Sequence, residues 1–327
     1  MNKLRILALL LALCLLLGCT PAPGPIPDTD DAGTGVPDGP SNEPDPQPEP
    51  TPDPIPDPEP APEPFLSVEE FPRMDGSTAN LPLMAAVLSA STGMTLEEAE
   101  NQVDCTTTPN AWYNLAEGYT DILLVYEAAE DTKKLLEDSG TELEITPIGL
   151  DALVFIVNEQ NPVTSLTQDQ LRQIYTGQIT DWADLGGEQL AITAFQRDPT
   201  SSSQSLFRKL LMPDTEPMEA PTELRPGDMG GLIEGLASYN NAGSAIGYSV
   251  FYYASYMYAK PGLRFVAVDG VMPSDETTAD QTYPLLNPFY VAIRADEPED
   301  SPARILRDWL VQQGADVISQ AGYIPIK

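Results

Sequence analysis

A long run of proline and acidic residues sets the first limit on what this chain can fold into. Residues 20–64 hold 17 prolines and 11 Asp or Glu, with neither Lys nor Arg. A segment of this composition cannot bury a core and stays extended. At about 3.1 Å per residue in polyproline II, it would reach roughly 140 Å at most. The composition predicts a tether for a folded domain, and it fits equally well a spacer with no further role.

The residues before this run have the pattern of a secretory signal. Lys3 and Arg5 precede a leucine-rich stretch, Ile6–Leu17, which is too short to span a bilayer comfortably. The stretch ends in Leu16-Leu17-Gly18-Cys19, which resembles the bacterial lipobox. The resemblance implies a lipoprotein signal peptide over 1–18, a lipid on Cys19, and an acidic, proline-rich disordered tether over 19–64. An ordinary cleaved signal and a short membrane anchor are the alternatives.

Cysteine and histidine usage restricts the chemistry of the remainder. Cys105 is the only cysteine after Cys19, so neither an internal disulfide nor a cysteine-rich metal site is expected. The chain has no histidine. This excludes Ser-His-Asp and Cys-His catalysis and the usual zinc and haem ligand sets. We therefore expect no catalytic residue, no metal and no cofactor.

The charge of the folded region argues against a nucleic-acid partner. Residues 65–327 carry 39 acidic and 14 basic side chains, a net charge of −25. A field of this sign also repels small anions at long range. An anion site in this chain must therefore work through local hydrogen bonds.

Strand and helix patterns alternate through residues 65–327, which indicates an α/β fold. The length is large for one core and suits two lobes. Strand patterns cover 121–126, 153–157, 191–195, 245–249, 264–268 and 289–293. Helix patterns cover 81–89, 133–139, 203–211, 230–238, 302–313 and 316–321, with a further start at Pro109 and capping boxes at Thr95 and Thr167.

Two hydroxyl-rich stretches are predicted to begin helices, Asp75–Ala79 and Arg197–Ser203. A helix start has unpaired backbone N–H groups and the positive end of a dipole, which suits an anion. A guanidinium can also chelate two oxygens of one oxyanion. Together these stretches predict a small oxyanion held between two lobes, although ordinary N-capping would explain each stretch alone.

An ordered set of segments strengthens this interpretation. It comprises Asp75–Thr78, Asp151–Asn158, Leu166–Gly177, Trp182–Gly187, Arg197 with Ser201–Ser203, Ala245–Tyr248 and Tyr283–Leu285. In this order they are similar to PstS-like phosphate-binding lipoproteins of ABC importers, which have a type II periplasmic-binding-protein fold. The resemblance implies two α/β lobes with two interlobe crossovers and a ligand cleft. Lobe 1 would be 66–150 plus 284–327, and lobe 2 would be 151–283.

The resemblance also implies which residues bind phosphate. A threonine cap would explain Thr108 equally well, and the family usually has glycine where Ser202 falls. The implied ligands are Gly76, Ser77, Thr78, Ala79 and Thr108 in lobe 1, and Arg197, Ser201, Ser202 and Ser203 in lobe 2.

The ligand's proton needs an acceptor. Phosphate carries a proton at neutral pH and sulfate does not, so a buried carboxylate can favour phosphate. The family places an Asp just after the strand that corresponds to Ile122–Val125, where this chain has Tyr126-Glu127. We predict Glu127 as the acceptor, with Asp75 in reserve. Alternatively, Glu127 only begins the acidic stretch Glu127–Asp131.

The expected function is a non-enzymatic, lipid-anchored binding protein on the extracytoplasmic face of the bacterial cell membrane. It would capture inorganic phosphate for an ABC permease, contact the membrane through the lipid on Cys19, and be a monomer. The alternatives are a binder of sulfate, molybdate or tungstate, and a surface lipoprotein for phosphate sensing or adhesion. A phosphatase is disfavoured by the lack of histidine and of a dense set of metal ligands.

Overall fold

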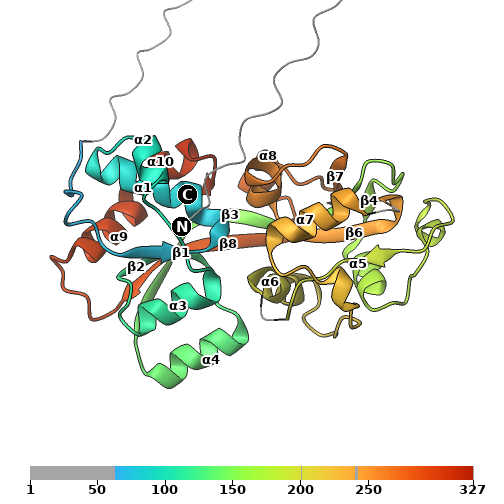
Figure 1. The fold of residues 1–327 in the computed structure, drawn as a ribbon, viewed down its shortest axis with the longest axis horizontal. Coiled ribbons are helices and arrows are strands. Elements are labelled where there is room, and N and C mark those ends of the chain that lie inside the picture. Colours follow the sequence, from blue (N-terminus) through green and yellow to red (C-terminus); the bar gives the residue numbers. More distant parts are fainter. Residues whose placement is uncertain (1–62, 200, 240–241, 327) are drawn as a thin grey trace, which may run out of the picture. The chain divides into compact units, whose positions relative to one another are not determined.

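Two lobes of helices and short strands, joined by two long strands, make up the described part of the chain (Figure 1). The structure, a computed structural model, describes residues 63–199, 201–239 and 242–326. The predicted signal peptide, Cys19 and nearly all of the predicted tether lie outside the described residues. The α/β, two-lobed fold class predicted from the sequence is confirmed.

Lobe 1 is built from both ends of the described chain. Its N-terminal part contains β1 (Met74–Gly76), η1 (Thr78–Asn80), α1 (Leu81–Thr92), α2 (Leu96–Glu100), α3 (Thr108–Ala116), β2 (Ile122–Tyr126) and α4 (Glu130–Ser139). Its C-terminal part contains α9 (Pro302–Gln313), α10 (Ala315–Gln320) and β9 (Ile324–Pro325). Helix α10 contacts α1, and α9 contacts the long strand β8 (Leu286–Arg294).

Lobe 2 is one continuous segment between the two long strands. Its elements are β4 (Ser165–Leu166), α5 (Gln168–Tyr175), η2 (Trp182–Leu185), β5 (Thr193–Ala194), α6 (Ser202–Leu211), η3 (Thr222–Leu224), α7 (Met229–Ser238), η4 (Ala242–Ser244), β6 (Ala245–Val250), the π-helix η5 (Tyr253–Met257), β7 (Leu263–Val268) and α8 (Asp275–Ala279).

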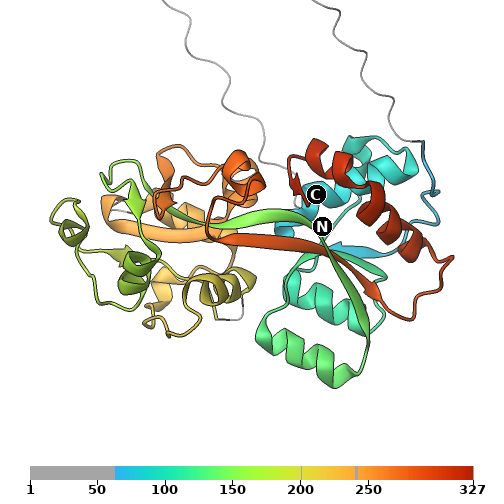
Figure 2. The same cartoon turned by 180° about the vertical axis from the view of Figure 1, so that it is seen from behind.

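Strands β3 (Leu143–Asn158) and β8 run antiparallel and connect the lobes (Figures 1 and 2). In lobe 1 the strand order is β1-β2-β8-β3, with β1 and β2 parallel. Strand β3 changes partners between Ala152, which pairs with β8, and Leu153, which pairs with β6. Beyond this point β7 pairs with the other edge of β3. One strand therefore belongs to the sheets of both lobes.

An aromatic cluster fixes α6 on the sheet of lobe 2. Phe207 of α6 stacks on Tyr248 of β6 with ring centroids 4.5 Å apart, and Tyr175 of α5 lies 4.7 Å from Phe207. Phe155 of β3 is fully buried beside them. The apolar run 153–157 is covered on both faces, as expected for a strand that is hydrophobic throughout. This packing sets the position of the α6 N-terminus.

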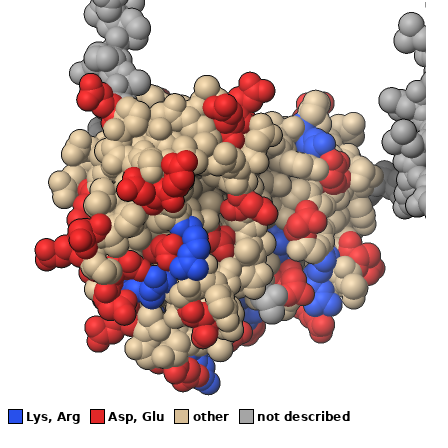
Figure 3. Space-filling model, turned by 60° about the vertical axis from the view of Figure 1, so that its left-hand side comes forward, with Lys and Arg blue, Asp and Glu red and all other residues tan. Residues whose placement is uncertain are grey.

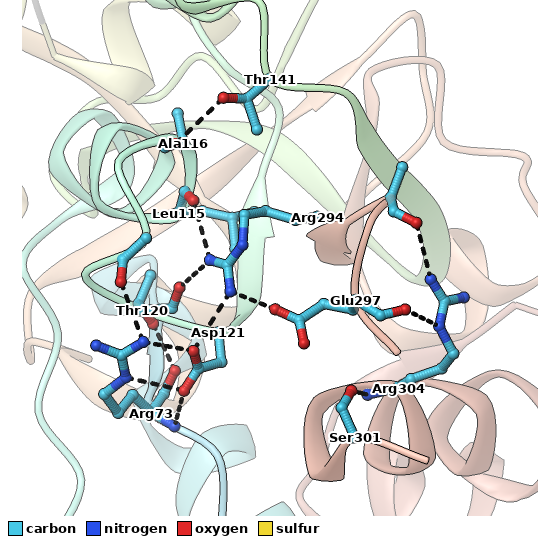
Figure 4. Close-up of polar contacts among 12 residues, drawn as sticks. Arg73, Leu115, Ala116, Thr120, Asp121, Thr141, Arg294, Glu297, Ser301 and Arg304 are labelled. Atoms are coloured by element: carbon cyan, nitrogen blue, oxygen red, sulfur yellow. Dashed lines mark hydrogen bonds and ion pairs between the residues drawn. The ribbon is translucent and has the colours of Figure 1, made fainter. Parts of the chain in front are cut away.

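A network of charged side chains holds the outer end of lobe 1 (Figure 4). Arg294, the last residue of β8, donates to the carbonyl oxygens of Thr120 (2.6 Å) and Leu115 (3.2 Å). Asp121 accepts from Arg73, just before β1, at 2.6 Å. The network ties α3 and the starts of β1 and β2 to β8, and so positions the opposite ends of these strands.

Local sequence signals match most of the observed elements. Both predicted capping boxes are present, at Thr95 and Thr167. Two predictions were wrong in extent: β3 begins ten residues before Leu153, and β5 has only two residues. Asp75 and Gly76 were expected at a helix start and instead end strand β1, after which η1 leads into α1.

Candidate functional site

Lobe 1 brings together three groups that lie far apart in the sequence. The hydroxyl oxygens of Ser77, after β1, and Thr108, at the start of α3, are 2.7 Å apart. The backbone N–H of Tyr126, at the end of β2, donates to the Ser77 hydroxyl at 3.0 Å. Ser77 is only 2% exposed. Whichever hydroxyl donates within the pair, the other keeps its proton for a ligand.

Asp75 fastens the turn after β1 to the turn before α3. One carboxylate oxygen accepts from the backbone N–H of Gly76 (2.7 Å) and Thr106 (2.8 Å). The other accepts from the Thr106 hydroxyl (2.6 Å) and the Asn114 amide (3.0 Å). All four bonds come from the protein, so Asp75, the reserve acceptor, has a structural role here.

The backbone is strained at the start of α3. Thr107 has φ 79° and ψ 157°, a conformation that is nearly restricted to glycine. Its neighbours are both anchored, Thr106 to Asp75 and Thr108 to Ser77. These contacts hold the strained residue in place and direct the first turn of α3 towards Ser77. No signal in the sequence predicted this.

Gly76 has a packing role that the sequence did not predict. A Cβ at this position would lie 2.1 Å from the carbonyl oxygen of Leu124 on β2. Close approach of β1 and β2 therefore requires glycine whether or not a ligand also comes near. Contact between Gly76 and a ligand stays a prediction.

The residues that follow lie in the η1 turn. The Cys105 thiol donates a long hydrogen bond, 3.8 Å, to the Thr78 hydroxyl oxygen. The carbonyl oxygen of Ala79 accepts from the Tyr323 hydroxyl at 2.7 Å. Asn80 is fully buried, and neither polar atom of its amide has a partner among the described residues. Sequence reasoning did not single out Asn80.

In lobe 2, Arg197 is held by neutral oxygens. Its guanidinium donates to the hydroxyl of Ser203 (3.0 Å) and to the carbonyl oxygens of Pro226 and Gly227 (both 3.1 Å). It is 6% exposed, and burial lowers its pKa. None of the ion pairs found among the described residues includes Arg197. A buried cation held in this way suits an anionic ligand.

The three serines lie at the start of α6. Ser201 is the N-cap, and its hydroxyl accepts from the backbone N–H of Gln204 at 3.3 Å. Ser202 is the first helical residue, and Ser203 contacts Arg197. The structure thus joins the predicted arginine to the predicted helix start through its hydrogen bond to Ser203.

Glu127 forms ion pairs with both lobes. It contacts Lys133 of α4 at 2.8 Å and Lys209 of α6. Partial burial alone would raise the pKa of Glu127, but hydrogen bonds from these two lysines outweigh it and lower the pKa below its ordinary value. The predicted acceptor is therefore an ionised group with two cationic partners.

The Glu127–Lys209 pair shows that the end of β2 in lobe 1 contacts the last turn of α6 in lobe 2. Glu127 follows Tyr126, whose N–H contacts Ser77, and Lys209 lies on the helix that begins with Ser202. Helices α3 and α6 also lie on the same side of β3 and β8 (Figures 1 and 2). No hydrogen bond found in the described part of the chain joins Ser77 or Thr108 directly to Arg197.

Comparison with known proteins identifies the family of this chain. The PBP superfamily domain matches residues 71–310. The chain belongs to this family. The phosphate-binding protein PstS of Bacillus subtilis is 25% identical over 257 residues, which are 77% of this chain and 80% of the relative. PstS of Borreliella burgdorferi is 24% identical over 201 residues, 60% of this chain and 70% of that protein. The predicted resemblance to PstS-like proteins is confirmed.

Solved structures share the fold of this PBP-superfamily chain. One, from Clostridium perfringens, is assigned as a phosphate ABC transporter substrate-binding protein and contains bound phosphate. It is 24% identical, with a TM-score of 0.57 over 78% of this chain and 98% of that one. An ABC-type phosphate transport receptor from Vibrio cholerae is 23% identical, with a TM-score of 0.56 over 77% and 98%.

The surface of the PBP-superfamily chain is predominantly acidic. Acidic side chains are spread over the face shown in Figure 3, with fewer basic ones between them. Among the described residues, no group of three His, Cys, Asp or Glu could hold a metal ion. None of the helices in this part of the chain is both long enough and apolar enough to span a membrane. Any attraction for an anion must come from the local donors, because the overall field opposes it.

Proposed function

We propose that this chain is an extracytoplasmic binding protein that captures inorganic phosphate for an ABC importer. The observation that carries the proposal is the buried guanidinium of Arg197, which contacts Ser203 at the start of α6 and forms no direct ion pair among the described residues, although the charges of Asp228 and Asp198 act on it from farther away. The names of the PstS relatives support phosphate as the ligand. Binding without catalysis is the common property that these names and the family suggest.

Each lobe would contribute donors to one phosphate. Lobe 1 would use the hydroxyls of Ser77, Thr78 and Thr108 with the backbone N–H groups of Thr78 and Ala79, because those of Gly76 and Ser77 donate to Asp75 and Leu124. Lobe 2 would use the guanidinium of Arg197 with donors from Ser201, Ser202 and Ser203. Hydrogen bonds to a charged group contribute about 1.5–3 kcal/mol each, so a few of them offset the unfavourable field of the acidic surface. Hinge closure of the lobes would complete the site.

Glu127 remains the proposed acceptor of the phosphate proton. Its carboxylate already contacts both lobes through Lys133 and Lys209. Each carboxylate oxygen of Glu127 contacts one lysine and keeps a further lone pair, so Glu127 could accept a hydrogen bond from the phosphate hydroxyl without losing either lysine.

Calorimetry with inorganic phosphate tests the proposal. We expect micromolar or tighter binding by the wild type and severe weakening in Arg197→Ala. Arg208→Ala is the matched control, because it removes one positive charge from α6 but pairs with Glu216 at the exposed surface. Absence of heat at micromolar phosphate in the wild-type protein would refute the proposal. Competition with sulfate, molybdate and tungstate would reveal a different oxyanion.

The anchor and the partner are separate parts of the proposal. A lipid on Cys19 would hold the protein at the outer face of the membrane, with a permease as the recipient of phosphate. Cys19→Ala should move the protein from the membrane fraction to the medium or periplasm. If fractionation is unchanged in this variant, the lipid anchor is refuted while phosphate binding is unaffected.

A further inference from the structure

A buried carboxylate lies where β3 passes from one lobe to the other. Asp151 is 2% exposed and precedes the point at which β3 changes partners. One oxygen accepts from the backbone N–H of Ala152 (2.7 Å) and Tyr252 (3.0 Å). The other accepts from the hydroxyl of Tyr126 at 2.6 Å. Asp151 thus binds Tyr126 of lobe 1 and Tyr252 of lobe 2 at the same time.

Each of these tyrosines leads to the proposed anion site. The backbone N–H of Tyr126 donates to the Ser77 hydroxyl at 3.0 Å. The ring of Tyr252 stacks on Tyr323 with centroids 3.6 Å apart, and the Tyr323 hydroxyl donates to the carbonyl oxygen of Ala79 at 2.7 Å. Two contact chains therefore connect Asp151 to the two ends of the 77–79 turn.

The titratable neighbours of Asp151 are the hydroxyls of Tyr126 on β2, Tyr252 next to the π-helix, and Tyr323 near the C-terminus. The Tyr126 hydroxyl donates to Asp151, whereas those of Tyr252 and Tyr323 donate to the carbonyl oxygens of Ala321 and Ala79. Asn287 lies opposite Asp151 in the β3–β8 ladder, and its amide nitrogen has no partner among the described residues. No Lys or Arg forms an ion pair with Asp151 in the described part of the chain. An ionised carboxylate accepts the bonds from the Tyr126 hydroxyl and from the backbone N–H groups of Ala152 and Tyr252, whereas a protonated one adds a further donor.

We propose that Asp151 is a positioning residue for the anion site, which holds the 77–79 turn in its binding geometry while the carboxylate is ionised and loosens it on protonation. The inference rests on the proposed phosphate-binding function. The oxygen that accepts two backbone N–H bonds is occupied, so the proton would go to the oxygen that faces Tyr126 and make it a weaker acceptor of the Tyr126 hydroxyl. Tyr126 would then be held less firmly, and its backbone N–H supports Ser77. Burial raises the pKa of Asp151 to about 6, so the change falls in a mildly acidic range. Phosphate binding should therefore weaken as the pH falls through this value.

Asp151→Asn tests the inference because the amide places a donor opposite Tyr126, as the protonated acid does. Calorimetry with inorganic phosphate would be run on the whole protein between pH 5 and pH 8. The titration of phosphate itself affects both proteins equally and cancels in the ratio of their dissociation constants. We expect the variant to bind about 3- to 10-fold more weakly at pH 7.5, which corresponds to a pKa change of about half to one unit on binding. The ratio should approach one at pH 5.

Asp121→Asn is the control, since Asp121 is a partly buried acid of lobe 1 whose ion-pair partners are Arg73 and Arg294 and which forms no hydrogen bond with Asp151 in the described part of the chain. Its pH profile should parallel that of the wild type. If the ratio of the phosphate dissociation constants of Asp151→Asn and the wild type does not change with pH, Asp151 has only a structural role and the inference is overturned. A ratio that grows at low pH would also overturn it, because charge repulsion would then dominate.

A second measurement covers the case in which Asp151→Asn does not fold. By linkage, phosphate must lower the pKa of Asp151 if ionised Asp151 favours binding. Carbon NMR of the wild-type carboxyl groups, with and without saturating phosphate, measures this directly. An unchanged pKa of Asp151 on binding overturns the inference. Lack of phosphate binding by the wild type would instead refute the proposed function, and calorimetry would show this first.

Discussion

Replacing Lys209 should speed the release of phosphate, because its ion pair with Glu127 connects the two lobes. In the Glu127–Lys209 pair, the glutamate side chain is 29% exposed and the lysine 54%. Pairs exposed to this degree contribute about 0.2–1 kcal/mol, so loss of the pair should accelerate release about 1.4- to 5-fold. Stopped-flow mixing of the loaded protein with a phosphate trap measures the rate.

Lys133→Ala provides the matched control for Lys209→Ala. Lys133 contacts the same carboxylate from α4 in lobe 1, so its removal leaves the interlobe contact in place. We expect an unchanged release rate in Lys133→Ala. Salt is a second control, because at 1 M ionic strength the screening length is about 3 Å and the effect of Lys209→Ala should nearly vanish. Equal acceleration in the two lysine variants, or an effect that persists at high salt, would contradict the interlobe role.

Glu127→Gln separates the interlobe role from that of a proton acceptor. If Glu127 only holds the lobes together, the variant should lose a similar small factor of affinity for every oxyanion tested. If Glu127 accepts the phosphate proton, the variant should gain affinity for sulfate relative to phosphate. A competition series of phosphate and sulfate on the wild type and the variant decides between the two roles.

Three further changes test the geometry of the fold. Thr107→Gly should raise the free energy of unfolding by about 1 kcal/mol in urea titrations, because it relieves strain at φ 79°; a decrease would show that the observed conformation is not costly. Gly76→Ala should lower it by about 1–3 kcal/mol, since the new Cβ would meet the Leu124 carbonyl at 2.1 Å; a neutral effect would contradict the tight β1–β2 contact. The raised pKa of Asp151, about 6 in the folded state, means that its contribution to stability is greatest below about pH 4 and is lost as the pH rises through 6. The difference in unfolding free energy between wild type and Asp151→Asn should therefore fall between pH 4 and pH 7, and a constant difference would refute this.

Elements with local signals could be predicted from the sequence. The capping boxes at Thr95 and Thr167 satisfy their own helix starts through residues three positions away. Strand β2 is an apolar run that is buried throughout. The first part of β3 had no such signal, because Pro147 and Gly149 flank a register shift and the pairing partner, β8, lies more than 130 residues away. Its formation depends on contacts that no local window contains.

The candidate site likewise contains residues that the sequence indicates and contacts that only the folded chain creates. The resemblance to the family led to Ser77, Thr108, Arg197 and Ser203, and the structure pairs the first two and the last two. The contacts of the other residues at the site depend on parts of the chain that are far apart in the sequence. Glu127 is paired with a lysine 82 residues away, which cannot be predicted from an acidic stretch. The links from Asp151 to Tyr126 and Tyr252 are equally non-local.

The way β3 and β8 enclose lobe 2 has a consequence for the order in which the protein is made. Strand β2 acquires its neighbour β8 only after the ribosome has synthesised the whole of lobe 2. Helices α9 and α10 of lobe 1 emerge later still. Lobe 2, in contrast, has all its helices in one uninterrupted stretch and can collapse as soon as that stretch is available. The part of the protein that begins first is therefore the last to be completed, and the turn that contains Ser77 acquires its contact at Ala79 only when the C-terminal segment with Tyr323 arrives.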